Sequence, residues 1–459
     1  MPELVLVTGG SGYIAGWCIA ELLHRGYDVR TTVRSPERER FVTEAVSTEV
    51  DPAGRLSFAV ADLTADDGWD AAMKGVDYVL HVASPLGAAS DDPQALIAPA
   101  RDGTLRVLRA ATAAGVRRVV MTSAANAASP SSYAAEGVTD ETLWTDPDDP
   151  TLIPYRRSKT LAERAAWDYM EDYDGPTELT TVLPGAVFGP VLTPDNLGSV
   201  GIIARMVSGQ MAGAPRIGLE VVDVRDLVDA HILAMTSSVA AGQRFLATGE
   251  FLWMTDMARI LRDGLGERGR QVKTRRIPDF AVRLTARFKD PSLREITPLL
   301  GRRNRHSTEK ARTLLGWQPR PAREAVLDCA DSLIAHGAVQ PRRRHRQGRT
   351  REGPQPRTLV AGSGKVTPVS SSETVHRCRA TTGSPAAGER PTRVGVPRIS
   401  NMPSGPTKPA PGRSWTAAYR VGSAPARLSW ATSLLPRRRA RPRRRLASLL
   451  WRLVAAQPG

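Results

Sequence analysis

Two side chains with complementary proton chemistry, Tyr155 and Lys159, stand four residues apart in the segment YRRSKTLAERAAW. On a helix, this spacing places both side chains on one face. A tyrosine of ordinary pKa, about 10, is a poor acid or base at neutral pH, but a neighbouring ammonium favours the phenolate and lowers that pKa. The pair therefore predicts proton transfer between Tyr155 and an oxygen of a small molecule. The alternative is an exposed tyrosine and lysine with no shared role.

A glycine-rich turn near the start of the chain is the second chemical signal. In VTGGSGYIAGW, Gly9 permits a tight turn, Gly12 lets a pyrophosphate approach the backbone, and the small Ala15 lets a helix pack on the preceding strand. The free N–H groups at the start of that helix attract phosphate oxygens. The segment predicts a dinucleotide-binding turn. A glycine-rich turn without a ligand is the alternative.

The residue after the second predicted strand, Arg34, indicates which dinucleotide is bound. NAD is usually gripped there by a carboxylate on the ribose, whereas NADP needs a cation for its additional phosphate. Arg34 offers a planar set of donors suited to that phosphate, and Arg38 and Arg40 could assist. The sequence therefore favours NADP, in the form of NADPH, over NAD. A solvated surface arginine is the alternative.

These residues need a scaffold that brings a turn, a strand end and a helix together. Short apolar segments alternate with helical stretches such as residues 12–25, which Gly26 ends. This alternation predicts βαβ units and an α/β fold of the Rossmann type, with a doubly wound parallel sheet. The predicted strands are residues 3–9, 27–33, 55–63, 76–83, 117–124 and 178–189.

Residues 1–338 are predicted to form one catalytic domain of two parts. Residues up to about 190 would be mainly dinucleotide-binding, and residues from about 190 to 338 would form a smaller C-terminal substrate-binding lobe with closing helices. Gly337 is a plausible stop for the last of these helices. The helical segments predicted in this lobe are residues 221–235, 254–266, 310–317 and 323–337.

The positive charge of the chain, +16 over 459 residues, belongs to its C-terminal part. Residues 340–459 hold 25 basic and 3 acidic residues, whereas residues 1–339 hold 38 and 44. The basic pI therefore does not indicate that the whole protein binds nucleic acid. The Arg/Pro-rich tail, residues 339–459, buries too little apolar surface to offset chain entropy and is predicted to be disordered. Only residues 443–456 could form a short basic amphipathic helix.

Two interpretations of the tail stay open. It could be a basic appendage that binds nucleic acid or anionic lipid. The favoured interpretation is unselected sequence added to a complete enzyme, since 56 Arg against 7 Lys fits GC-rich DNA translated in the wrong frame. The three cysteines have no paired or metal-like spacing, and neither a signal peptide nor an apolar run of membrane-spanning length is evident. A cytoplasmic protein is expected, with no membrane association and no metal.

Taken in order, the motifs resemble those of the extended short-chain dehydrogenase/reductases, within the NAD-dependent epimerase/dehydratase family. The dihydroflavonol 4-reductase-like carbonyl reductases are the most similar subgroup. Besides the segments above, ADL (61–63), HVASP (81–85), LPGAVFGP (183–190) and DVRDLVDAH (223–231) carry the resemblance, which covers residues 3 to about 338. It implies an NADP-dependent oxidoreductase that reduces a ketone or aldehyde, with hydride from NADPH and a proton from Tyr155.

The resemblance also assigns roles to single residues. Lys159 would bind the nicotinamide ribose and tune Tyr155, while His81 is interpreted as structural. Asp62 and Leu63 would meet the adenine, Ala83 would line the cofactor, and Pro184 and Val187 would flank the nicotinamide. The full cofactor-binding set is Gly9, Gly12, Tyr13, Ile14, Arg34, Asp62, Leu63, Ala83, Lys159, Pro184 and Val187.

One departure from the family pattern concerns the substrate oxygen. The family usually has three hydroxyl residues after the fifth strand, the third of which binds that oxygen, but this chain reads Thr122-Ser123-Ala124. Ser123 could replace the missing donor through a shifted loop, Asn126 or Ser129 could substitute, or catalysis could proceed without it. Losing such a donor typically costs about 10²–10³ in rate.

Two other functions compete with carbonyl reduction. A nucleotide-sugar epimerase or dehydratase would use the same Tyr–Lys pair with a retained NAD, which Arg34 disfavours. A non-catalytic NADP-binding sensor has only Ala124 in its favour, and the Tyr155/Lys159 pair opposes it. The sequence leaves open the identity of the small-molecule carbonyl substrate, the stereochemistry and a homodimer.

Overall fold

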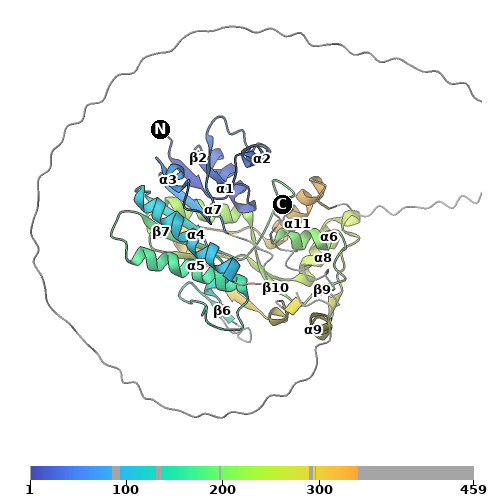
Figure 1. The fold of residues 1–459 in the computed structure, drawn as a ribbon. Helices are drawn as coiled ribbons and strands as arrows, with labels where there is room; N and C mark the ends of the chain where they lie inside the picture. The colour runs from blue at the N-terminus through green and yellow to red at the C-terminus, as the bar shows by residue number, and fades with distance from the viewer. Residues whose placement is uncertain are drawn as a thin grey trace, which may run out of the picture. The chain divides into compact units, whose positions relative to one another are not determined.

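A seven-stranded parallel sheet forms the centre of the chain in the computed structural model (Figure 1). The structure describes residues 2–84, 94–130, 137–195, 198–288, 293–294 and 296–339. All neighbouring strands of this sheet run parallel, so they end at the same edge. In spatial order the strands are β11 (Arg244–Ala247), β7 (Glu178–Pro184), β5 (Arg118–Thr122), β4 (Tyr78–His81), β1 (Leu4–Val7), β2 (Asp28–Val33) and β3 (Leu56–Val60).

Alternate residues of the central strands supply two cores, as the two-residue period of a strand requires. Val5 and Val7 of β1 pack in one core with α1 (Tyr13–His24) and α7 (Val224–Thr236). Leu6 packs in the other core with α4 (Gln94–Ala113) and α5 (Pro154–Glu171), which lie side by side in Figure 1. Helices on both faces of a parallel sheet confirm the predicted doubly wound Rossmann-type fold.

A third core belongs to the smaller lobe. It joins apolar residues of α6, α8 and α11 to Phe188 and Val221 on two short strands. The helices of the smaller lobe are α6 (Val200–Val207), α8 (Met254–Gly264), α9 (Asp279–Phe288) and α11 (Ala322–Ala335). Of the other helices, α2 (Glu37–Val46) and α10 (Glu309–Leu315) pack on the core of α1 and α7, and α3 (Trp69–Met73) packs on the core of α4 and α5. Gly26 and Gly337 have φ values of +89° and +68° just after α1 and α11, which confirms both predicted helix stops.

The predicted strand over residues 178–189 is wrong as a single element. The chain leaves the large sheet at Pro184 and forms β8 (Ala186–Phe188) in a separate three-stranded sheet. Gly185 makes this change possible, because a Cβ atom there would lie 2.4 Å from the Glu220 carbonyl oxygen. The other strands of that sheet are β10 (Gly218–Asp223) and β12 (Glu250–Trp253).

Residues 221–235 also divide differently from the prediction, since Val221 to Asp223 complete β10 and the helix starts at Val224. Asp223 caps α7 by accepting a hydrogen bond from the backbone N–H of Arg225 at 2.9 Å. Two strand pairs complete the lobe: β9 (Ala214–Pro215) with β13 (Arg276–Ile277), and β6 (Gly137–Thr139) with β14 (Asn304–His306). Within the described ranges no helix has the length and apolar content to cross a bilayer.

The predicted tail lies outside the described residues except for its first position. Val339 is 3% exposed and packs in the core of the smaller lobe. The amphipathic segment predicted at residues 443–456 also lies outside the described ranges.

Candidate functional site

The predicted site residues gather at the carboxyl edge of the large sheet. Gly9 follows β1, Arg34 follows β2, Asp62 follows β3, Ala83 follows β4 and Ser123 follows β5. Pro184 is the last residue of β7, and Lys159 comes from α5, which packs on the same sheet. This edge is where ligands bind in open α/β sheets.

The turn between β1 and α1 has the shape that a pyrophosphate requires. Gly9 has a φ of +74°, and a Cβ atom there would lie 2.9 Å from the Ala83 Cβ atom. Gly12 donates its N–H to the Gly9 carbonyl oxygen at 2.9 Å, and α1 begins at the next residue. No side chain caps this helix, so the first N–H groups of α1 remain available to phosphate oxygens.

Tyr13 and Ile14 occupy the first turn of α1, where backbone N–H groups have no partner within the helix. Both side chains are partly buried and pack on the main core, and the Tyr13 ring also packs on the core of the smaller lobe. The Tyr13 hydroxyl is buried and has no hydrogen-bond partner within the described residues. The Tyr13 side chain therefore connects the start of α1, beside the predicted dinucleotide-binding turn, to both lobes.

His81 holds the ends of β1 and β4 together. The Thr8 hydroxyl oxygen accepts the N–H groups of Val82 and Ala83 at 3.1 and 3.0 Å, so its proton points to His81 Nδ1, 3.0 Å away. His81 Nε2 lies 3.3 Å from the Thr104 hydroxyl. Burial lowers the pKa of His81 to about 3, and the Lys159 charge acts in the same direction. These bonds support a structural role for this neutral histidine and fix Ala83 against Gly9.

The three arginines that follow β2 differ in the contacts that their side chains make. Arg34 is exposed and forms no salt bridge within the described ranges. Arg38 lies over the Phe41 ring at 5.7 Å, and Arg40 is paired with Glu44 at 2.6 Å. Arg34 and Arg38 could thus face an anion at this edge, whereas Arg40 is directed along its own helix.

Asp62 and Leu63 form the wall beside Arg34. The Asp62 carboxylate accepts the backbone N–H and hydroxyl of Thr64 at 2.8 and 2.7 Å. These bonds hold the pKa of Asp62 below its ordinary value, with a further contribution from the Arg34 guanidinium. Leu63 lies close to α4, since a Cβ atom added at Gly103 of that helix would be 2.7 Å from the Leu63 Cβ atom. The loop that would meet the adenine is thereby fixed in shape.

The catalytic pair lies on the first turns of α5, which starts at Pro154. Lys159 is 6% exposed, and its ammonium is 3.4 Å from the Thr122 carbonyl oxygen at the end of β5. Burial lowers the pKa of Lys159 to about 8, although Glu163 opposes this shift. Burial raises the pKa of Tyr155 to about 12. The pKa of Tyr155 therefore moves opposite to the direction predicted from the Tyr–Lys spacing, because burial disfavours the charged phenolate.

The hydroxyl of Ser123 is already engaged. It donates to Glu163 Oε2 at 2.6 Å, and the Ser123 side chain is buried. Ser129 is equally occupied, since its hydroxyl donates to the Ala125 carbonyl at 2.8 Å and lies 2.8 Å from His306 Nε2. Asn126 is partly exposed, and its side chain forms no hydrogen bond within the described residues. Of the three candidate substitutes for a hydroxyl at Ala124, only Asn126 has an uncommitted side chain.

Pro184 and Val187 lie on either side of the change from β7 to β8 and are both buried. The Gly185 N–H bonds the Ala247 carbonyl at 3.4 Å, which keeps the end of β7 in register with β11. Because β7 pairs with β5, Pro184 and Val187 lie near the sheet edge that carries Ser123 and Lys159.

Three residues at this edge were not found by sequence reasoning. Glu163 is buried one helical turn after Lys159, a spacing that could have indicated it. Arg244 pairs with Glu163 at 2.9 Å, and His306 links Ser129 to the Glu220 carboxylate. Nothing local in the sequence marks Arg244 or His306, since their partners are far away in the chain.

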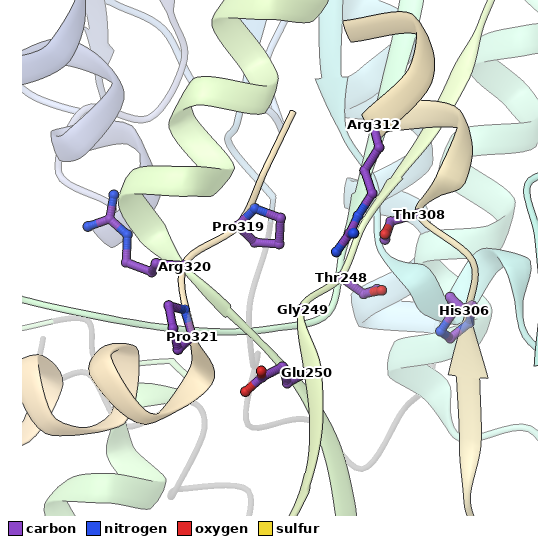
Figure 2. Close-up of a pocket in the computed structure, with 9 residues that line it drawn as sticks. All are labelled: Thr248, Gly249, Glu250, His306, Thr308, Arg312, Pro319, Arg320 and Pro321. Atoms are coloured by element: carbon purple, nitrogen blue, oxygen red, sulfur yellow. The ribbon is translucent and has the colours of Figure 1, made fainter. Parts of the chain in front are cut away.

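A separate cavity of about 250 Å³ lies beside the smaller lobe, and Figure 2 shows its lining. None of the predicted site residues lines it. The Thr248 hydroxyl is buried there without a hydrogen-bond partner among the described residues, and His306 forms part of the wall. The lining comprises residues 248–250, 306, 308, 312 and 319–321.

Comparison with known proteins adds to this geometry. The model of the NAD dependent epimerase/dehydratase family matches residues 5–246. Cinnamoyl-CoA reductase CAD2 of Medicago truncatula is 37% identical over 270 residues, which cover 57% of this chain and 81% of that protein. An anthocyanidin reductase ((2S)-flavan-3-ol-forming) of Vitis vinifera is 34% identical over 271 residues, 56% of this chain and 79% of that protein.

Solved structures show the same similarity. The yeast methylglyoxal/isovaleraldehyde reductase Gre2, crystallised with NADPH, superposes with a TM-score of 0.61 and 26% identity. The match covers 73% of this chain and all of that one.

Proposed function

The chain belongs to the NAD dependent epimerase/dehydratase family, and we propose that it acts there as an NADP-dependent oxidoreductase that reduces a ketone or aldehyde to an alcohol. The observation that carries this proposal is the position of the Lys159 ammonium at the end of β5, with Tyr155 one turn earlier on α5. It places proton chemistry at the same sheet edge as the dinucleotide turn. The similar reductases from Medicago, Vitis and yeast support the reductase over an epimerase or dehydratase.

The residues at this edge fit NADPH. Gly9 and Gly12 leave space for the pyrophosphate at the start of α1, and the exposed Arg34 suits the additional phosphate. Tyr13 and Ile14 would contribute backbone N–H groups. Asp62 and Leu63 would contact the adenine, and the nicotinamide would lie among Ala83, Pro184 and Val187, with Lys159 on its ribose. Bound NADPH supplies the hydride that the carbonyl carbon accepts.

Tyr155 then supplies the proton. A pKa of about 12 keeps its hydroxyl protonated at neutral pH, which is the state that a proton donor needs. As the substrate carbonyl gains negative charge, the Tyr155 hydroxyl gives it a proton and becomes a phenolate. The Lys159 ammonium stabilises that phenolate, so its charge matters most after proton donation.

A hydrogen-bond donor for the substrate oxygen is the open part of the site. Ser123 is the residue that the chain retains from the family pattern, but its proton is directed to Glu163. Among the described residues the Asn126 side chain forms no hydrogen bond, and we propose its amide as the donor if Ser123 keeps its bond to Glu163. Replacing Asn126 with Ala would then lower kcat by about 10²-fold.

The test of the proposed function is NADPH consumption with a panel of carbonyl compounds. The names of the relatives suggest cinnamoyl-CoA, methylglyoxal and isovaleraldehyde, to which diketones and aromatic ketones are added. Turnover of at least one compound, abolished in Tyr155→Phe with NADPH affinity retained, supports the mechanism. Turnover that persists in Tyr155→Phe removes this tyrosine from its role.

Tight NADPH binding with no turnover of any compound would favour the sensor alternative, whose support is Ala124. Preference for NAD that stays bound through purification would favour an epimerase or dehydratase. A cytoplasmic location and a homodimer are further proposals, to be checked by fractionation and by light scattering.

A further inference from the structure

A carboxylate that the sequence did not single out, Glu163, is fully buried one turn after Lys159 on α5. Its two oxygens accept four hydrogen bonds. Oε1 takes the Thr181 hydroxyl at 2.8 Å and Arg244 Nε at 2.9 Å, and Oε2 takes the Ser123 hydroxyl at 2.6 Å and the Arg244 terminal nitrogen at 3.3 Å. Thr181 and Arg244 lie on the neighbouring strands β7 and β11, and Ser123 directly follows β5. Glu163 therefore joins the catalytic helix to the sheet edge.

Arg244 is held independently of this carboxylate. Its guanidinium also donates to the carbonyl oxygens of Glu141 and Leu143, and it lies 3.6 Å from the centre of the Trp144 ring. Loss of the Glu163 carboxylate would leave this buried guanidinium without its ionic partner. A buried ion pair loses the hydration of both charges, so it is weak evidence for a purely stabilising role. This suggests another role for the Glu163 carboxylate.

Lys159 is the other charge that Glu163 faces. The lysine is nearly inaccessible, and burial opposes its charge, whereas Glu163 favours it. Other titratable groups near Lys159 among the described residues are Tyr155, one turn earlier on α5, and His81 at the end of β4, with His231 on α7 bonded to the Thr122 hydroxyl. Burial keeps both histidines neutral at neutral pH. Glu163 is therefore a carboxylate that offsets the Lys159 charge, and the same carboxylate is paired with Arg244.

We propose that Glu163 is a positioning residue that keeps the Lys159 ammonium charged for cofactor binding and at the same time holds Ser123 away from the substrate oxygen. This proposal rests on the proposed function, in which Lys159 binds the nicotinamide ribose. If Glu163 only held the structure together, its hydrogen bonds would matter and its charge would not. If Glu163 controls Lys159, the negative charge of Glu163 is required. Variants that remove either the charge or one hydrogen bond separate these two roles.

The experiment measures NADPH affinity of the full-length protein by fluorescence between pH 6 and pH 10. Arginines stay charged across this range, and ionisation of the additional phosphate of NADPH is the same for every variant, so we expect deprotonation of Lys159 to set the loss of affinity at alkaline pH. The variant is Glu163→Gln, which keeps the shape and removes the charge. Thr181→Val is the matched control, because it removes one hydrogen bond to Glu163 and no charge.

We expect the alkaline midpoint of NADPH binding to fall by about one pH unit in Glu163→Gln and to stay at the wild-type value in Thr181→Val. Glu163→Asp keeps a carboxylate, so its alkaline midpoint of NADPH binding should lie close to that of the wild type. The alkaline limb of kcat/KM should move with the binding midpoint. A Glu163→Gln midpoint equal to that of the wild type overturns the proposal.

Glu163→Gln leaves Arg244 without its carboxylate, and the variant could fail to fold. In that case the double variant Glu163→Gln/Arg244→Gln replaces both buried charges. Its midpoint should still lie below the wild type, because Glu163 shifts the pKa of Lys159 and Arg244 is not among the causes of that shift. A midpoint at or above the wild type overturns the proposal. A wild-type protein that binds no NADPH overturns the proposed function itself.

Discussion

His231 makes the folded protein sensitive to mild acid. This residue of α7 is completely buried, its Nδ1–H donates to the Leu227 carbonyl oxygen at 2.7 Å, and its Nε2 accepts the Thr122 hydroxyl at 2.7 Å. Both nitrogens are thereby used in the neutral form. Burial lowers the pKa of His231 from 6.5 to about 4. A proton added at Nε2 would break the bond to Thr122 and leave a buried charge.

The size of the effect follows from proton linkage. In the unfolded chain an ordinary histidine is almost fully protonated at pH 5, whereas His231 in the folded protein would carry only about 0.1 proton. The unfolded state therefore binds more protons, and stability falls as the pH drops below 6.5. Between pH 7 and pH 5 this single residue should remove about 2 kcal/mol of the free energy of unfolding. The free energy of unfolding of a typical domain is only about 5–15 kcal/mol.

Urea unfolding followed by tryptophan fluorescence at pH 7, 6 and 5 tests this value. His231→Gln does not titrate, and it should be less stable than the wild type at pH 7 by about 1–3 kcal/mol through lost hydrogen bonding. Its further loss between pH 7 and pH 5 should, however, be about 2 kcal/mol smaller. His24→Gln, at an exposed histidine, is the matched control and should follow the wild type. An equally steep loss in His231→Gln and the wild type would refute the reasoning.

Three further substitutions or deletions test other parts of the molecule. Arg34→Asp should raise the KM for NADPH by about 10²-fold and change that for NADH by less than about threefold, and equal effects would show that Arg34 does not touch the phosphate. Ala124→Ser should leave kcat unchanged or raise it, by at most about 10²-fold, and a severe loss would show a loop geometry unlike that of the family. Removal of all residues after Val339 should leave the unfolding midpoint and NADPH turnover unchanged, and loss of either would mean that the tail takes part in the fold.

The sequence predicted the elements whose signals are local. Buried parallel strands are short apolar runs, so β1, β2, β3, β4 and β5 were recognised within a few residues of their ends. The strands of the smaller lobe have only two to six residues, and β10 runs directly into α7, so the predicted helical segment 221–235 includes the last three residues of β10. The break at Gly185 depends on the approach of Glu220, 35 positions later, which no local pattern shows.

The site divides in the same way. Spacing alone predicts roles for Gly9, Gly12, Arg34 and the Tyr155/Lys159 pair, because each of these signals is local in the sequence. The pKa of Tyr155 is different, because it depends on how deeply the folded chain buries the phenol, and burial reversed the direction that spacing suggested. The contacts of Arg244 link residues about 80 and 100 positions apart, so only the folded sheet brings them together.

The end of β5 explains why a chain can lack the third hydroxyl and still keep the first two. The Thr122 hydroxyl binds His231, and its carbonyl oxygen lies 3.4 Å from the Lys159 ammonium. The Ser123 hydroxyl binds Glu163, and its N–H bonds the Val182 carbonyl at 2.8 Å. Both hydroxyls therefore hold the strand to neighbouring helices, so losing either leaves a buried polar partner unsatisfied. Ala124 has no polar side-chain group, so alanine at this position leaves no hydroxyl of its own to satisfy in the fold.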